Sequence, residues 1–565
     1  MNRVRISVGV SDFKKIRDND ACYVDKTGLI RELLHTENAE VTLITRPRRF
    51  GKTMAMSMLA HFFDIRENSR RIFEGLKISD ETEICEKWMN QYPVLFVSFK
   101  DIDGLDFDSA KRMLRSKIFQ LCVEHIYLEK SERISEYERK AFSQMADRVD
   151  GEIADDQLKT GISLIMRMMQ KHYMKPVILL IDEYDVPVAK ANVNGYYVQM
   201  LDLMKGILST ALKDNPALKF AVVTGCLRIT KESIFTGANN FTTDTISDRR
   251  YDEYFGFTAK EVKKLLRDAD LEDRFGIVRQ WYDGYHFGDM DIYCPWDVLN
   301  YIEKAISQGL EKPENFWENT SDNAVVGQFL ERTDFDVTEK FETLLAGGYI
   351  KETISENLTY CSMTTSEANL WSLLYMTGYL TKARPQELKE GDKLEEKQTA
   401  LRIPNAEVMD IFRSSVVEWF YKKSAGSDRR ELFELLWSGN AKKLTELLSD
   451  LLFDTISFHD YAESFYHAFV TGLVAGAGYI VESNYENGLG RSDIVIKDRR
   501  NRRAAVIEAK TAASERALEK ECTDALKQIE EKQYAKKIER SGFKKVLRYG
   551  IAFYQKECLV KTLEE

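Results

Sequence analysis

The chain has 565 residues, and at roughly 100–200 residues per domain this length predicts three or more domains. Hydrophobic residues make up 44% and charged residues 30%, and the formal net charge is −10, so the composition excludes a disordered chain and one that is basic throughout. The N-terminal segment lacks the apolar core of a signal peptide, no run of about 20 apolar residues follows it, and the eight cysteines form no CxxC pair. We therefore expect a cytoplasmic protein with reduced thiols and no membrane partner.

Apolar, β-branched runs alternate with helix-forming segments between residues 41 and 224. The runs are VTLIT (41–45), PVLFVSF (93–99), PVILLID (176–182) and KFAVVTG (219–225). Strands that are apolar on both faces are typical of a parallel sheet covered by helices on each side. We therefore predict an α/β domain with crossover helices over residues 1–245.

The pattern changes twice after this domain. Residues 246–385 contain shorter amphipathic helices and aromatic-rich turns, which predict a helical lid or small subdomain. The charged segment 382–396 marks a boundary, and linker helices are expected over 386–430. Residues 431–565 predict an α+β domain, with strands at 478–483, 493–497, 504–509 and 546–554 and one charged helix over 512–537.

The segment RPRRFGKT (46–53) predicts a phosphate-binding loop between a strand and a helix. It matches the Walker A template GxxxxGK[ST] at its last three residues, although Arg46 stands where the template has Gly. The helix N-terminus attracts phosphate, Lys52 would reach the β- and γ-phosphates of ATP, and Thr53 would bind Mg²⁺. The candidate ATP contacts are Arg46, Pro47, Arg48, Arg49, Phe50, Gly51, Lys52 and Thr53. The alternative is a basic turn before a helix.

Two later strand ends complete the predicted ATP site. VILLIDEYD (177–185) is an apolar strand of the Walker B type, in which Asp182 would hold Mg²⁺ and Glu183 would polarise the attacking water. At the end of the next strand, VVTGCLRIT (222–230), Thr224 and Arg228 are candidates to face the γ-phosphate. The alternative is two ordinary strands that end in polar turns. An acidic pair after the strand is typical of the P-loop ATPases that include the AAA proteins.

The motifs together resemble the bacterial AAA-ATPase-like family, whose members read RPRRFGK[ST] at the loop and typically carry a C-terminal PD-(D/E)XK nuclease-superfamily domain. The resemblance implies ATP binding, and a fold with an AAA-like parallel sheet, a helical lid and a C-terminal α+β domain of the restriction-endonuclease type. It rests on YVDKT (23–27), RPRRFGKT (46–53), LIDEYDVP (180–187), TGCLR (224–228), FGFT (255–258), WYDGYHFG (281–288), FWENTS (316–321), LWSLLYMTGYLT (370–381) and IPNAEV (403–408).

A second site is predicted in the C-terminal domain, where GLGRSDIVI (488–496) precedes AAVIEAK (504–510). On adjacent strands, Asp493 and Glu508 could share Mg²⁺. Lys510 is two residues from Glu508 and so lies on the same face of its strand, where it could orient a water and stabilise charge on a phosphate. Glu463 is a further candidate acid, and Gln528 occupies the place of the helical glutamine of the superfamily. The alternative is a set of solvated charges at strand ends.

Three functional hypotheses follow. In the first, ATP gates or drives Mg²⁺-dependent cleavage of DNA or RNA, which residues 491–510, with seven basic and three acidic residues, would hold by its phosphate backbone. In the second, the chain is a nucleotide-dependent switch whose C-terminal domain is an inactive binding module for nucleic acid or protein. In the third, ATP is the only substrate. A homo-oligomer is also considered, in which Arg228 or an arginine of the loop completes the site of a neighbour.

Overall fold

The computed structural model divides the chain into two compact units. The first comprises Met1–Phe316, Glu352–Lys382 and Lys393–Thr399, and the second comprises Trp317–Lys351, Ala383–Asp392 and Ala400–Glu565. The predicted domain boundaries at 245, 385 and 430 stay predictions. The described residues are 4–35, 40–146, 154–228, 241–317, 326, 337–358, 362–363, 365–424, 430–455, 463–475, 479–487 and 490–563.

A five-stranded parallel sheet forms the centre of the first unit, as the apolar runs predict. Its strand order is β2-β3-β4-β1-β5. The strands are β1 (Val41–Thr45), β2 (Val94–Ser98), β3 (Val177–Asp182), β4 (Leu218–Gly225) and β5 (Phe241–Asp244). β5 was not predicted, since its segment FTTD is short and mostly polar and lies at the edge of the sheet.

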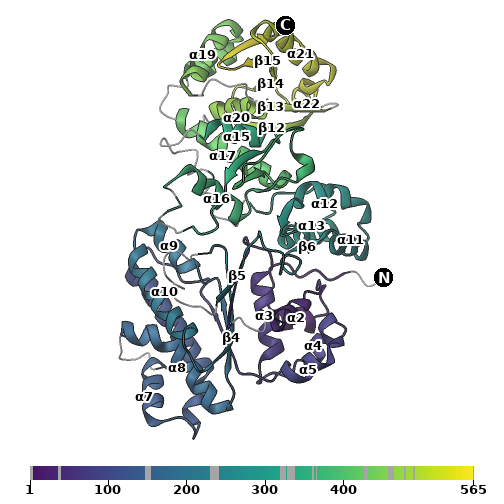
Figure 1. Cartoon of the computed structure of the whole chain (residues 1–565). Helices are drawn as coiled ribbons and strands as arrows, with labels where there is room; N and C mark the ends of the chain where they lie inside the picture. Colours follow the sequence, from purple (N-terminus) through teal and green to yellow (C-terminus); the bar gives the residue numbers. More distant parts are fainter. Residues whose placement is uncertain are drawn as a thin grey trace. The chain divides into compact units, whose positions relative to one another are not determined.

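Helices cover both faces of this sheet, with α2 and α3 on one side and α8 and α10 on the other (Figure 1). Burial on both sides explains why β1 and β3 are buried along their whole length and consist mostly of apolar residues. The helices before β5 are α1 (Phe13–Asp18), α2 (Gly28–Leu34), α3 (Lys52–Phe63), α4 (Arg70–Phe73), α5 (Thr82–Trp88), α6 (Phe107–Glu124), α7 (Glu136–Ala146), α8 (Asp155–Tyr173), α9 (Val186–Asn194) and α10 (Tyr197–Leu212).

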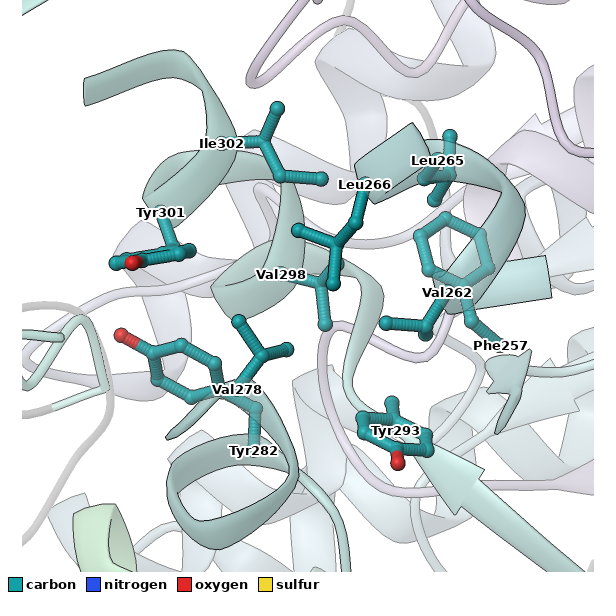
Figure 2. Close-up of a cluster of buried hydrophobic side chains, with 10 residues drawn as sticks. All are labelled: Phe257, Val262, Leu265, Leu266, Val278, Tyr282, Tyr293, Val298, Tyr301 and Ile302. Carbon is teal, nitrogen blue, oxygen red and sulfur yellow. The ribbon is translucent and has the colours of Figure 1, made fainter. Parts of the chain in front are cut away.

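A small subdomain follows within the same unit and has its own core. In Figure 2, side chains of α11, α12 and α13 point toward one another around Val298 and Leu266. The Thr258 Oγ1 and the Glu261 carboxylate cap the start of α11. Its elements are β6 (Phe257–Thr258), α11 (Ala259–Asp268), α12 (Phe275–Tyr282), β7 (Tyr285–Phe287), β8 (Met290–Tyr293) and α13 (Pro295–Gln308), with the strands paired in the order β6-β8-β7. The predicted helices are therefore present, together with a small sheet that was not predicted.

Shorter elements lie around the boundaries between the units, and helices lead into the second sheet. They are α15 (Thr338–Leu345), β9 (Ile350–Thr353), α16 (Glu367–Thr377), β10 (Thr381–Lys382), β11 (Gln398–Arg402), α17 (Ala406–Ser424), α18 (Arg430–Ser438), α19 (Ala441–Thr455) and α20 (Glu463–Val474). No helix of the described ranges is long and apolar enough to cross a membrane.

The second unit contains a five-stranded mixed sheet in the order β12-β13-β14-β15-β16. Only β14 and β15 pair in parallel, so a crossover is needed between them, and α21 and α22 provide it. The single helix predicted over 512–537 is wrong, because Gln533 adopts a left-handed conformation with φ 55° that separates the two helices. The elements are β12 (Ile480–Asn487), β13 (Gly490–Asp498), β14 (Arg503–Thr511), α21 (Leu518–Glu531), α22 (Tyr534–Arg540), β15 (Lys545–Tyr554) and β16 (Glu557–Thr562).

Candidate functional sites

The loop between β1 and α3 wraps around the side chain of Lys52. Arg49 and Gly51 have positive φ angles of 71° and 85°, and Gly51 adopts this conformation freely because it has no Cβ. The Lys52 Nζ donates to the carbonyl oxygens of Arg46 at 3.1 Å and Pro47 at 3.0 Å. The ammonium group therefore lies inside the loop at the N-terminus of α3, where the helix dipole favours an anion.

Asp182 at the end of β3 connects the loop helix with β4. The Thr53 Oγ1 donates to Asp182 Oδ2 at 2.9 Å, and the Thr224 Oγ1 donates to Asp182 Oδ1 at 2.7 Å. Asp182 is fully buried, and burial, followed by the charge of Glu183, raises the pKa of its carboxyl group. Hydroxyl and carboxylate oxygens are the hard donors that suit Mg²⁺, so the residues present fit this cation.

Glu183 lies beside the lysine of the loop. Its Oε1 is 3.5 Å from Lys52 Nζ, and its φ angle of 53° turns the chain sharply after β3. Burial by itself lowers the pKa of Lys52, but Cys226, Glu183 and other acidic groups outweigh it, so the net pKa is raised and the lysine stays charged. The Glu183 Oε2 is buried without a hydrogen-bond partner among the described residues. It can therefore accept a hydrogen bond from a water next to the phosphate position.

The structure places Arg46 away from the interior of the loop. Its guanidinium group is fully buried, pairs with Asp244 Oδ1 at 2.5 Å and donates to the carbonyl oxygen of Thr45 at 2.8 Å. The rings of Phe255 and Phe287 lie 5.3 and 5.5 Å from its Cζ. Arg46 therefore joins the first position of the loop to β5, which explains why a large cation stands where the general template has Gly.

The other basic residues of the loop point to two different surroundings. Arg48 interacts electrostatically with Cys226, on the loop after β4. Arg49 lies over the ring of Trp296, with its Cζ 5.3 Å from the ring centroid. Phe50 is fully buried against the aromatic residues of β7, so it anchors the loop to the small subdomain.

A cavity of about 300 Å³ adjoins Lys52 and Thr53, and its size is near the lower end of the range found for ligand pockets. The N-terminal segment and the small subdomain form its walls. Tyr23, Tyr254 and Trp296 supply aromatic surface to it. A cavity with apolar walls beside the loop 46–53 has room for a flat heterocycle.

In the second unit, Asp493 and Glu508 lie opposite each other on neighbouring antiparallel strands. The register of β13 and β14 pairs Ile494 with Ile507, which sets the two acids side by side. The Asp493 Oδ2 accepts a hydrogen bond from the Ala509 N–H at 2.8 Å. Burial raises the pKa of Asp493. The predicted pair of acids is therefore assembled, and Lys510 follows on the same strand face as Glu508.

Gln528 reaches this pair from α21, and its Nε2 donates to Glu508 Oε1. The close approach of α21 to β15 depends on Gly550, because a Cβ there would lie 2.4 Å from the carbonyl oxygen of Cys522. Glu463 is the first residue of α20, and its side chain lies outside the described residues. Within the described ranges, no three His, Cys, Asp or Glu side chains gather in a group that could hold a metal ion. Mg²⁺ commonly takes only one or two carboxylates and keeps several waters, so the Asp493–Glu508 pair still fits it.

Two residues that the structure brings to these sites were not among the predicted site residues. Asp185 accepts hydrogen bonds from the N–H groups of Cys226 and Leu227, both at 3.0 Å. His467, one helical turn after Glu463, contacts the carbonyl oxygen of Asp493 through Nε2 at 3.0 Å. For Asp185, the third acid in LIDEYD was a usable signal, and for His467 the four-residue spacing from a candidate acid was one.

Comparisons with known proteins match the two parts of the chain in which these residues lie. Residues 7–235 match the family model described as "Predicted AAA-ATPase", and residues 461–563 match that of the PD-(D/E)XK nuclease superfamily. The chain therefore combines an AAA-ATPase-like part with a C-terminal part of the PD-(D/E)XK nuclease superfamily, as the motifs indicated. It is also similar to a protein of Azotobacter chroococcum mcd 1 named "Uncharacterized protein in vnfD 5'region", with 24% identity over 564 residues, 96% of this chain and 95% of that protein.

Proposed function

We propose that this protein is an ATP-dependent, Mg²⁺-dependent nuclease, in which ATP bound at the loop 46–53 controls cleavage of nucleic acid at the Asp493–Glu508 pair. The observation that carries the proposal is this pair of acids facing each other across β13 and β14, with Lys510 on the same face. ATP and nucleic acid are both substrates of phosphoryl chemistry, and each site holds a lysine beside carboxylates.

At the first site, Lys52 would neutralise the β- and γ-phosphates of ATP, and Thr53 and Asp182 would hold Mg²⁺. Glu183 would orient the attacking water, since its Oε2 has no partner among the described residues. The aromatic cavity beside the loop would take the base of the nucleotide. Hydrolysis would then change the contacts around Lys52 and Glu183, which lie 3.5 Å apart in this structure.

At the second site, Asp493 and Glu508 would hold Mg²⁺, and the ion would supply charge stabilisation for the phosphate under attack. Lys510 would orient the water and stabilise the negative charge that develops. Gln528 would keep Glu508 in place through its amide. The exposed arginines at 499, 500 and 502, in the turn between β13 and β14, would hold the phosphate backbone without reading its sequence.

The test is a cleavage assay of the full chain on single- and double-stranded DNA and RNA, with Mg²⁺ or Mn²⁺ and with or without ATP. We expect metal-dependent cleavage that Glu508→Gln and Lys510→Ala abolish. The matched controls are Glu530→Gln and Lys527→Ala, which change exposed residues of α21 and should leave cleavage unchanged. If Lys52→Ala leaves cleavage unchanged, the nuclease activity does not depend on ATP binding.

One observation favours the second hypothesis, a nucleotide-dependent switch with an inactive binding module. Asp493 Oδ2 and Glu508 Oε1 each already accept a hydrogen bond from the protein, so the two acids are partly satisfied without a cation. In that case no substrate is cleaved, ATP is still hydrolysed, and nucleic acid or protein binds with an affinity that Glu508→Gln leaves unchanged.

A further inference from the structure

The turn after β3 and the loop after β4 are joined by a set of hydrogen bonds that the proposed ATP site does not explain. The backbone N–H of Tyr184 donates to the carbonyl oxygen of Thr224 at 3.1 Å, and the Tyr184 hydroxyl donates to that of Leu227 at 2.6 Å. Asp185 Oδ2 accepts from the N–H groups of Cys226 and Leu227, both at 3.0 Å. We call Tyr184 and Asp185, with these contacts, the clamp.

The clamp is closely packed against the loop it holds. A Cβ at Gly225 would lie 2.6 Å from Asp185 Oδ1 and 2.6 Å from the Tyr184 ring, so no larger residue fits between them. Tyr184 is fully buried and Asp185 is 2% exposed. A buried hydrogen-bonded contact of this kind holds the two segments as one body, because opening it would leave several polar groups without partners.

Burying a carboxylate here is costly. The Asp185 Oδ1 has no hydrogen-bond partner among the described residues. An incompletely satisfied charged group destabilises a fold, so a residue of this kind is expected where function requires it. Neither member of the clamp lines the cavity beside the loop 46–53. Their hydrogen bonds go to the end of β4 and to the loop after it, so these are the segments that the clamp can position.

The clamped loop carries a residue suited to a phosphate. Arg228 directly follows Leu227, and its Nε is buried without a partner among the described residues. Cys226, at the start of the same loop, lies 3.6 Å from Lys52 Nζ. The loop therefore lies beside the lysine that would bind the β- and γ-phosphates, and it carries a donor that makes no hydrogen bond within the described part of the chain.

We propose that Asp185 and Tyr184 are positioning residues for ATP hydrolysis, which hold the loop 225–228 so that Arg228 meets the γ-phosphate. This inference rests on the proposed ATPase function. The clamp acts on the transition state through Arg228, and it contributes little to the initial binding of ATP, which the loop 46–53 provides.

The experiment measures kcat and KM for ATP hydrolysis by the full chain and its variants. We expect Asp185→Ala to lower kcat by about 10- to 100-fold and to leave KM within about threefold, because a small misplacement of a catalytic group has effects of this size. Asp185→Asn keeps an acceptor oxygen for both N–H groups and should retain most of kcat. Asp202→Ala, at an exposed acid of α10, is the control with unchanged kcat.

A double-mutant cycle distinguishes positioning from general stabilisation. If Asp185 acts through Arg228, adding Asp185→Ala to Arg228→Ala lowers kcat little further, whereas independent effects multiply. Tyr184→Phe, which removes a single hydroxyl, tests the same clamp if Asp185→Ala does not fold. Three results would overturn the inference. The first is that the effects of Asp185→Ala and Arg228→Ala on kcat multiply, and the second is that kcat is unchanged in both Tyr184→Phe and Asp185→Ala. The third is that Asp185→Asn and Asp185→Ala lower kcat equally. A wild-type protein that does not hydrolyse ATP would instead overturn the proposed ATPase itself.

Discussion

Removing the buried charge of Arg46 tests whether this residue anchors the loop 46–53 or binds phosphate. Arg46→Met leaves Asp244 buried, 2% exposed, without its cationic partner. Breaking a buried ion pair on one side costs about 3–5 kcal/mol of stability. For a unit of this size, such a loss lowers the melting temperature by about 4–7 °C.

The double variant Arg46→Met, Asp244→Leu separates the two roles. It removes both charges from a site that Phe255 and Phe287 already make apolar, so most of the lost stability should return. If Arg46 is an anchor, ATP affinity also returns to within about threefold of wild type, a difference of less than 1 kcal/mol. Calorimetric melting and ATP titration of the full chain measure the two quantities.

The loss of stability in Arg46→Met also depends on pH. Burial raises the pKa of Asp244 even beside Arg46, and without Arg46 this pKa rises further. A carboxyl group with a raised pKa in the folded state contributes stability below its unfolded pKa and loses it as pH rises through the folded value. Arg46→Met should therefore be less destabilised at pH 5 than at pH 8. The anchoring role of Arg46 would be refuted if the double variant were as unstable as Arg46→Met. It would also be refuted if the double variant were stable but no longer bound ATP.

Three further predictions concern the other contacts. Burial raises the pKa of Asp185 to about 6, so its contribution to stability is present below pH 4 and lost as pH rises through about 6. The melting temperature of Asp185→Asn should therefore be higher than that of wild type at pH 8 and nearly equal to it at pH 4. Equal melting temperatures at pH 8 would show that the buried charge of Asp185 does not destabilise the fold. Gly550→Ala should push α21 from β15, destabilise the second unit by about 1–3 kcal/mol and weaken cleavage by displacing Gln528, as paired melting and cleavage assays would reveal. His467→Ala removes the contact to the Asp493 carbonyl oxygen. It should raise the Mg²⁺ concentration needed for half-maximal cleavage by about tenfold, the lower end of the effects seen when residues that hydrogen-bond to metal ligands are replaced. An unchanged Mg²⁺ requirement would show that His467 does not position Asp493.

Local patterns in the sequence determined a large part of this protein. The continuous apolar runs located β1, β2, β3 and β4, because strands covered on both faces consist mostly of apolar residues. The spacing of Glu508 and Lys510 placed both on one face, since side chains alternate along a strand. The order of strand, loop and helix was enough to locate Lys52 at a helix N-terminus.

Other features were decided by contacts between residues far apart in the chain. Arg46 carries the same charge as Arg48 and Arg49, and only the position of Asp244, 198 residues later, directs it into the core rather than toward the loop interior. β5 is too short and polar to be recognised alone, and it is held by its pairing with β1. Sequence patterns report the period of a helix or strand, whereas the partner of a buried charge depends on which strand ends meet once the sheet has formed.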